Sequence, residues 1–314
     1  MVTLKRLNVE KFRHIEDTSI DFGKYLTVIS GLNGTGKSSI LGLAGHLFSF
    51  REKVKKNTKR TLSGDYFETE YSEIFRFCPE HDLDKIYKYE AILEENDEEI
   101  SKSAKSRYSE SEKRFRIDVG GRKEGEGKIV HPVIFLGLRR LFPLAQEKEK
   151  DFLINTHSLE ERDTLFYKNE SEEIFVSLQK NINPQHIKTK HKDFLSIQTK
   201  NYNIIGNSAG QDNIGQILTS VISLKKLNQG GVLLIDELDT TLFPGAQINL
   251  IKRLYGYARR FNLQIIFTTH SLEIIKFLNE QNYEGEDESV KAEMKEDKEE
   301  KESISVGKAV EQGV

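Results

Sequence analysis

Three glycines, a lysine and a serine lie close together near the start of the chain, in residues 31–38. The segment reads Gly-Leu-Asn-Gly-Thr-Gly-Lys-Ser and matches the phosphate-binding pattern G-x-x-x-x-G-K-[ST] without deviation. In such a loop the backbone N–H groups point inward, and glycine permits the tight turns because it has no Cβ to clash. We therefore expect residues 31–38 to bind the phosphates of a nucleotide.

The flanking residues predict the elements that present this loop. Residues 25–30 form an apolar, β-branched run of strand length, and residues 39–48 have the character of a helix. A helix that begins at the loop directs the positive end of its dipole at a bound anion. The predicted contacts of ATP are Asn33, Gly34, Thr35, Gly36, Lys37, Ser38 and Ser39. Among them, Lys37 is expected to reach the β- and γ-phosphates, and the Ser38 hydroxyl to bind Mg²⁺ as well.

Two carboxylates follow a second apolar strand much later in the chain. Residues 231–235 read Gly-Val-Leu-Leu-Ile, and Asp236 and Glu237 come directly after them, which is a Walker B pattern. Phosphoryl transfer to water needs a metal ion to neutralise charge on the phosphate oxygens and a base to align the nucleophile. We predict that Asp236 holds Mg²⁺, directly or through water, and that Glu237 orients and deprotonates the attacking water.

Composition limits the class of protein. The chain has 314 residues, of which 37% are hydrophobic and 31% charged, so it is polar but long enough to bury a core. The single cysteine, Cys78, excludes an intrachain disulfide and a cysteine metal cluster. Residues 1–6 lack an apolar signal core, and no apolar run reaches the length of a membrane span. We expect a cytoplasmic protein without membrane contact.

Charge is unevenly distributed along the chain. The formal net charge is −3, but acidic residues are concentrated in 284–302, which leaves the rest of the chain mildly basic and compatible with DNA binding. Two basic clusters either contact a phosphate backbone or form ordinary solvated surfaces. They are Arg51, Lys53, Lys55, Lys56, Lys59 and Arg60, and then Lys188, Lys190, His191 and Lys192.

The remaining periodicity indicates an α/β fold. Residues 4–12 and 19–22 alternate apolar and polar residues and predict two antiparallel strands before the loop. No sustained heptad repeat is present, which argues against a long coiled-coil arm. Further predicted elements are paired strands at 87–93 and 114–119 around a charged loop at 94–112, a buried strand at 131–136, and helices at 158–182, 244–261 and 271–281.

The beginning of the chain resembles a known family. Phe12-Arg13, then a strand, then the phosphate loop followed by Ser39 resembles the N-terminal half-motif of the RecF, SMC and OLD group of ABC-class ATPases. In that group a Phe-Arg pair precedes the loop, and asparagine is common at the position of Asn33. The resemblance implies that Arg13 lies close to the bound nucleotide.

A second matching segment is Asn207-Ser208-Ala209-Gly210-Gln211, which opens an amphipathic helix with Ser208 as a candidate N-cap. It resembles the ABC signature Leu-Ser-Gly-Gly-Gln at Ser208, Gly210 and Gln211, while Asn207 replaces the leucine and Ala209 the first glycine. In the family this helix N-terminus binds the γ-phosphate held by the other protomer.

The last matching segments lie after the two carboxylates. The strand 263–269 ends in Thr-Thr-His-Ser and resembles the family's H-loop, which implies that His270 contacts the γ-phosphate. Residues 242–244, Leu-Phe-Pro, resemble the Leu-His-Pro of OLD-type ATPases more than the Leu-Asp D-loop of transporters and SMC proteins, so a D-loop role for Asp239 is in question. A glutamine loop is not evident, and Gln146 is a weak candidate for it.

The resemblance implies an ABC-type ATPase head with a mixed β-sheet, an antiparallel β subdomain and a helical insertion. The predicted head covers 1–280, divided into an N-lobe (1–65), an insertion and helical region (66–203) and a C-lobe (204–280). The acidic tail, 281–314, is too polar to offset its ordering entropy and is expected to be largely disordered.

The closest resemblance is to OLD-type antiphage defence ATPases such as those of Septu and Gabija. It implies a head-to-head homodimer, with higher oligomers left open, that uses ATP to control a DNA-directed nuclease. Only a short polar segment follows the last predicted helix, so we expect the nuclease either to act in trans or to lie outside the given sequence. The alternatives are a RecF-like repair ATPase that binds DNA without a nuclease, and an ATP-gated scaffold with little turnover.

Overall fold

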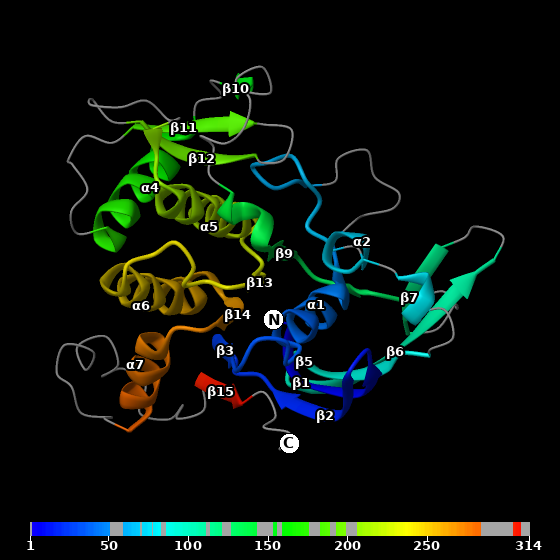
Figure 1. Ribbon diagram of the computed structural model, residues 1–314. Helices are drawn as coiled ribbons and strands as arrows, with labels where there is room; N and C mark the ends of the chain where they lie inside the picture. Colours follow the sequence, from blue (N-terminus) through cyan, green and yellow to red (C-terminus); the bar gives the residue numbers. More distant parts are fainter. Residues whose placement is uncertain are drawn as a thin grey trace.

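A five-stranded parallel sheet forms the centre of the computed structural model (Figure 1). Its order is β15-β3-β14-β13-β9, with β3 at Leu26–Ser30, β9 at Val133–Leu136, β13 at Gly231–Ile235, β14 at Leu263–Thr269 and β15 at Ile304–Lys308. The structure describes residues 2–50, 59–69, 71–76, 78–82, 86–110, 114–120, 127–142, 153–155, 159–175, 183–188, 193–198, 206–283 and 304–308.

Alternate residues of the central strands supply two hydrophobic cores. In β13, Leu233 and Ile235 belong to the core formed with the helices of one face, and Val232 and Leu234 belong to the core on the other face. Both faces of the sheet are therefore covered, which explains why its strands read as continuous apolar runs. The first core includes α4 (Glu161–Ile174), α5 (Ala209–Leu227), α6 (Pro244–Phe261) and α7 (Leu272–Tyr283), and the second includes α1 (Lys37–His46).

An antiparallel sheet packs beyond α1, in the order β2-β1-β5-β6-β7 (Figure 1). Its strands are β1 (Val2–Phe12), β2 (Ile15–Asp21), β5 (Lys88–Glu95), β6 (Glu98–Ser109) and β7 (Arg114–Val119). The predicted α/β class and the antiparallel subdomain are confirmed, with the parallel and antiparallel strands in separate sheets. Because β5 pairs with β1, and β6 and β7 extend the same sheet, part of the expected insertion joins the N-terminal strands.

The prediction of a charged loop at 94–112 is wrong, because most of these residues form strand β6. Asn96 and Asp97 have φ angles of 53° and 65°, which suits a two-residue hairpin turn between β5 and β6. The strands at 87–93 and 114–119 therefore do not pair with each other, since each pairs with β6. The polar residues of β6 hid the strand, because an antiparallel sheet can leave one face in water.

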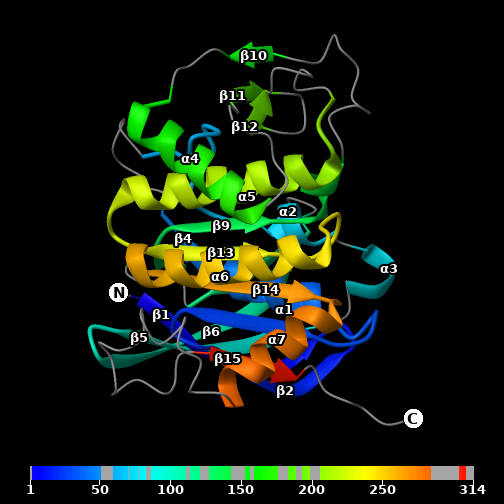
Figure 2. The ribbon, with the colours of Figure 1, turned by 90° about the vertical axis from the view of Figure 1, so that its left-hand side faces the viewer.

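Short elements complete the fold. Figure 2 shows the small outer sheet and α4 and α5 above the central strands, and the antiparallel sheet below them. The helix expected at 158–182 appears as α4, at Glu161–Ile174. The remaining elements are β4 (Phe48–Ser49) with β8 (Ile129–Val130), the outer strands β10 (Leu153–Asn155), β11 (Asn183–Lys188) and β12 (Asp193–Gln198), the turns α2 (Tyr71–Ile74) and α3 (Pro79–Asp82), and the 3₁₀ turn η1 (Leu138–Leu141).

A buried glutamine joins the two large sheets. Gln264 on β14 accepts a hydrogen bond from the N–H of Leu4 at 2.9 Å and donates to the carbonyls of Leu4 and Gly23 at 2.8 Å each. The amide thus satisfies main-chain groups of β1 that would otherwise be buried without partners. This contact holds the antiparallel sheet against the sheet that carries the phosphate loop.

A carboxylate ties α4 to α6. Glu170 is nearly buried and accepts two hydrogen bonds from Arg253, at 2.5 Å and 2.6 Å, and one from the hydroxyl of Tyr257. The bidentate pair raises the pKa of Arg253, with the hydrogen bond to Glu170 as the main cause. The pair aligns the two helices that cover one face of the sheet.

The end of the chain departs from the expected disordered tail. Helix α7 runs to Tyr283, and Ile304–Lys308 form strand β15, which pairs with β3 from Ile304↔Leu26 to Lys308↔Ser30. The expectation does not hold for these residues, because β3 offers an edge to pair with. The rest of the predicted tail lies outside the described residues. No helix in the described part of the chain is long and apolar enough to cross a membrane.

Candidate nucleotide-binding site

The loop between β3 and α1 has the backbone of a phosphate cradle. Gly34 and Gly36 have φ angles of 79° and 90°, in the left-handed region that side chains disfavour. Helix α1 begins at Lys37, two residues earlier than expected, with Gly36 as its N-cap. Its first N–H groups therefore face the loop without intrahelical partners and can bind an anion.

Lys37 lies inside this loop. Its ammonium donates to the carbonyls of Gly31 at 3.0 Å and Leu32 at 2.7 Å, and only 6% of the residue is exposed. Burial lowers the pKa of Lys37, and the carboxylates of Asp236, Glu237 and Asp239 act in the opposite direction. The charge is thus held where phosphate oxygens can replace the two carbonyls.

Asp236 receives hydrogen bonds from the start of helix α1 and from the end of strand β14. Its Oδ1 accepts from Ser38 Oγ at 2.9 Å and from Thr268 Oγ1 at 2.7 Å. The structure therefore brings together Ser38 and Asp236, the two expected metal ligands, across 198 positions of sequence. A hydroxyl and a carboxylate are hard oxygen ligands of the kind Mg²⁺ prefers, so this donor set fits the ion.

Glu237 lies next to this pair at the end of β13. Its N–H donates to Thr268 Oγ1 at 2.7 Å, and its Oε2 accepts from Thr240 Oγ1 at 3.2 Å. The residue has a φ of 49°, and its side chain is half-buried. Thr268, which the sequence did not single out, bridges the side chain of Asp236 and the backbone of Glu237.

His270 follows β14 at the same edge of the sheet and is exposed. Its N–H donates to Asp239 Oδ1 at 3.2 Å, and Thr269 Oγ1 donates to the same oxygen at 2.5 Å. Asp239 therefore anchors the turn that carries the histidine. Sequence reasoning missed this contact because it joins two loops whose proximity depends on strand pairing.

The hairpin that carries Arg13 packs against the phosphate loop. A Cβ on Gly36 would lie 2.7 Å from Ile15 and 3.1 Å from the ring of His14, so the hairpin tip touches the start of α1. The guanidinium of Arg13 lies over the ring of Phe75 at 5.4 Å and donates to the carbonyl of Arg76 at 2.9 Å. Arg13 thus lies near the loop while its described contacts hold it against the segment after α2.

A cleft of about 990 Å³ opens beside the loop, and Arg13, Ser38 and Asp236 lie in its wall. Arg140, from the turn η1 after β9, lines the same cleft. Strand β9 neighbours β13, and η1 follows β9 directly. Gln146, the weak candidate for a glutamine loop, lies outside the described residues. No sequence motif pointed to Arg140.

The signature-like helix has a complete capping box. Ser208 is its N-cap, the N–H of Gln211 donates to Ser208 Oγ at 3.3 Å, and the N–H of Ser208 donates to Gln211 Oε1 at 2.9 Å. A Cβ on Gly210 would lie 2.7 Å from the carbonyl of Thr241, so this position has no room for a larger residue. Asn207, at the position of the family's leucine, donates to Ser196 Oγ and the Ile197 carbonyl.

Comparison with known proteins now identifies the family. The family described as "AAA domain, putative AbiEii toxin, Type IV TA system" matches residues 26–276. The chain belongs to this AAA_21 family. The matched range begins at β3 and ends within α7, so it contains the phosphate loop, the two carboxylates and His270.

Two curated relatives match shorter segments of this AAA_21 protein. The Septu protein PtuA of Bacillus thuringiensis is 35% identical over 102 residues, 31% of this chain and 23% of PtuA. The DNA replication and repair protein RecF of Teredinibacter turnerae is 35% identical over 77 residues, 22% of this chain and 20% of RecF. The chain therefore spans less than a quarter of the length of either relative.

A solved structure supports the fold. An SMC head bound to the C-winged helix domain of ScpA has a TM-score of 0.50 at 13% identity, and the match covers 87% of this chain and 91% of that one. The family match and the two relatives make the chain an ABC-class ATPase of the RecF, SMC and OLD group, and the solved structure agrees with this in its fold.

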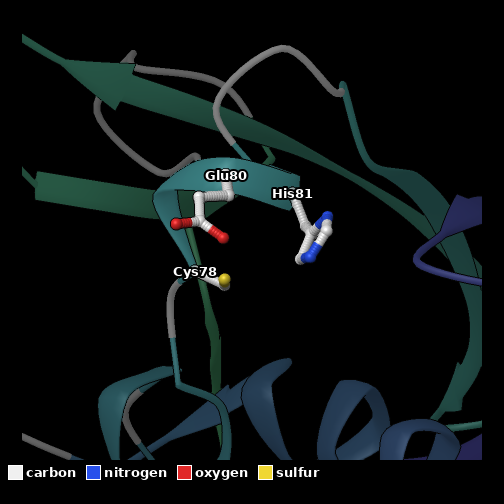
Figure 3. A group of neighbouring side chains, drawn as sticks. All are labelled: Cys78, Glu80 and His81. Atoms are coloured by element: carbon white, nitrogen blue, oxygen red, sulfur yellow. The ribbon is translucent and has the colours of Figure 1, made fainter.

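One further cluster in the AAA_21 protein has metal-ligating residue types. Potential ligand atoms of Cys78, Glu80 and His81 lie within 4.8 Å of one another around α3 (Figure 3). Glu80 and His81 are exposed, and all three belong to one short turn. A closed zinc site takes four ligands, so this group of three is not by itself a metal site.

The two basic clusters predicted from the sequence lie only partly within the described residues. In the first basic cluster, Arg60 donates to the carbonyl of Gly64 and stacks over Tyr66 at 4.0 Å, while residues 51–58 lie outside the described part. In the second, the side chain of Lys188 and residues 190–192 also lie outside it. DNA contact by either cluster stays a prediction.

Proposed function

We propose that this ATPase closes as a head-to-head homodimer on ATP and thereby regulates a nuclease that acts in trans on DNA. The carrying observation is the arrangement of one edge of the central sheet. The phosphate loop, the two carboxylates and His270 all follow the carboxyl ends of neighbouring parallel strands. The N-terminus of α5 contacts the loop after β13 instead, and Ser208 is exposed there.

The chemistry follows from the residues at this edge. The N–H groups at the start of α1 and the ammonium of Lys37 bind the phosphates, and Ser38 and Asp236 hold Mg²⁺. When bound, Mg²⁺ neutralises charge that develops on the phosphate oxygens. Glu237 accepts a proton from the attacking water, and His270 contacts the γ-phosphate from the adjacent strand end.

Exposed apolar side chains at the same edge support a partner surface. Leu32 after β3, Phe243 after β13 and Leu272 after β14 are 81%, 78% and 68% exposed. Large apolar side chains grouped around a polar site are typical of a surface that another protein covers. A second copy is the occupant we favour, because a twofold operation directs Ser208 and Gly210 of each copy at the nucleotide of the other.

The dimer is tested with two variants that fail for different reasons. Ser208→Arg should retain ATP binding but lose turnover and ATP-dependent dimerisation, since the arginine blocks the N-terminus of α5. Glu237→Gln should bind ATP and form a stable dimer without hydrolysis. Mixing the two should produce mixed dimers that trap nucleotide at one site only. A sedimentation experiment that finds an active monomer at all protein concentrations would contradict the dimer.

Similarity to the Septu protein PtuA supports a role in antiphage defence. The test is to express the chain with its neighbouring genes and assay the purified complex for DNA cleavage with ATP or a non-hydrolysable analogue. Cleavage that depends on the nucleotide state supports a nuclease in trans. Similarity to RecF favours the second candidate, a repair ATPase, which predicts junction-specific DNA binding without cleavage. Negligible hydrolysis under all these conditions would instead indicate a scaffold.

A further inference from the structure

Arg140 is a buried arginine that the chemistry above does not use. It lies in η1 after β9, and only 2% of it is exposed. Burial lowers the pKa of Arg140 to about 10, and the carboxylates of Asp236, Glu237 and Asp239 act in the opposite direction. The guanidinium therefore stays charged at neutral pH, and a buried charge is costly unless hydrogen bonds satisfy it.

The guanidinium joins three parts of the nucleotide-binding edge. Its Nε donates to Asn213 Oδ1 on α5 at 2.9 Å, and one terminal nitrogen donates to the carbonyls of Leu136 and Gly137 at 3.1 Å each. The other terminal nitrogen donates to the carbonyl of Glu237 at 2.7 Å. Only a planar fork with several N–H groups can reach all of these acceptors at once.

The contact with Glu237 holds an unusual backbone. A φ of 49° is in the left-handed region, which a residue other than glycine adopts only where its surroundings hold it there. The N–H of Glu237 donates to Thr268, and its carbonyl accepts from Arg140, so the peptides on both sides are held. The direction of the Glu237 carboxylate depends on this conformation.

Asn213 extends the connection to the start of α5. Its amide nitrogen donates to the carbonyl of Thr240 at 3.0 Å and to Thr241 Oγ1 at 3.4 Å, and the residue is fully buried. One turn earlier on the helix, Gly210 packs directly on the carbonyl of Thr241. A shift of the N-terminus of α5 must therefore move the loop that follows Glu237.

We propose that Arg140 and Asn213 are positioning residues that connect the N-terminus of α5 to the backbone of Glu237. When the nucleotide of a second copy binds the N-terminus of α5, the Glu237 carboxylate takes the orientation needed to activate water. Each site therefore hydrolyses ATP only when the dimer is closed. The inference rests on the proposed function, in which Glu237 is the base and α5 faces the partner. Its physical basis is that small displacements of a catalytic group lower turnover steeply.

The test compares Arg140→Lys and Asn213→Ala with the parent protein, using Arg139→Lys as the matched control on the exposed neighbouring position. The measurements are kcat and KM for ATP, and the Kd for AMP-PNP by titration calorimetry. We expect kcat to fall about 10- to 100-fold in both variants, as for a misplaced catalytic group. The affinity for AMP-PNP should stay within about twofold, because a transition-state interaction is lost and not ground-state binding. The Arg139→Lys control should behave like the parent.

A second arm separates positioning from general damage. In a Glu237→Gln background, Arg140→Lys should cause no further loss of turnover, because the group that it positions is already gone. The inference is overturned if Arg140→Lys lowers kcat in the Glu237→Gln background as much as it does in the parent. It is also overturned if both single variants keep the parental kcat. If Arg140→Lys does not fold, Asn213→Ala decides alone. Parental turnover of Glu237→Gln itself would instead overturn the proposed function.

Discussion

Two buried histidines predict that this ATPase loses stability in mild acid. His46, in the last turn of α1, and His131, before β9, are 4% and 5% exposed. Burial lowers the pKa of His46 to about 3, with nearby Lys128 acting in the same direction, and lowers the pKa of His131 to about 4. Both imidazoles are therefore neutral in the folded protein.

The sign and size of the effect follow from proton linkage. An unfolded histidine has its ordinary pKa of about 6.5. Between pH 6.5 and pH 4, therefore, both histidines bind a proton in the unfolded chain but not in the folded protein. Stability is complete above that window and falls as the pH decreases through it. At pH 5.5 each histidine lowers the free energy of unfolding by about 1.4 kcal/mol relative to pH 7.5, or nearly 3 kcal/mol for both.

Urea unfolding followed by circular dichroism at pH 7.5 and pH 5.5 measures this loss. Replacing both residues, His46→Gln and His131→Gln, should lower stability at pH 7.5 through lost packing but remove most of its dependence on pH. His81→Gln is the control, because His81 is exposed and its replacement should leave the pH dependence as in the parent. The reasoning is wrong if the double variant loses as much stability between the two pH values as the parent does.

Three further predictions concern the site and the helix layer. Lys37→Ala should weaken ATP binding at least about 100-fold, because it removes charge-assisted hydrogen bonds to phosphate; unchanged affinity in a titration would refute the loop's assignment. Glu237→Gln should retain ATP binding but slow phosphate release at least about 100-fold, and a parental rate would move the base elsewhere. Glu170→Gln should lower the free energy of unfolding by about 2 kcal/mol, less than for a fully buried pair because Arg253 is partly exposed. An Arg253→Met partner variant should lose at least as much, since it leaves the buried Glu170 carboxylate without a cation. Equal unfolding midpoints for parent and Glu170→Gln would argue against the pair.

Local signals in the sequence determined most of the motifs and several element bounds. The phosphate loop needs glycines, lysine and serine at consecutive positions, so its pattern is visible without a structure. Helix α6 was predicted at 244–261 and runs from Pro244 to Phe261, because proline suits a first helical turn and Asn262 ends the helix in the left-handed region. The strand before Asp236 was equally easy to predict, since a strand covered on both faces is apolar throughout.

Tertiary structure alone decided which distant residues meet. Strand β6 was hidden by its polar face, and β15 became a strand because β3 offered it an edge. Asp239 acquired its partners only when β13 and β14 paired. Arg140 reaches the carbonyl of Glu237 across 97 positions of sequence, through neighbouring strands β9 and β13. A side chain that binds a distant main-chain carbonyl needs no particular residue type there, so the sequence carries no trace of the pair.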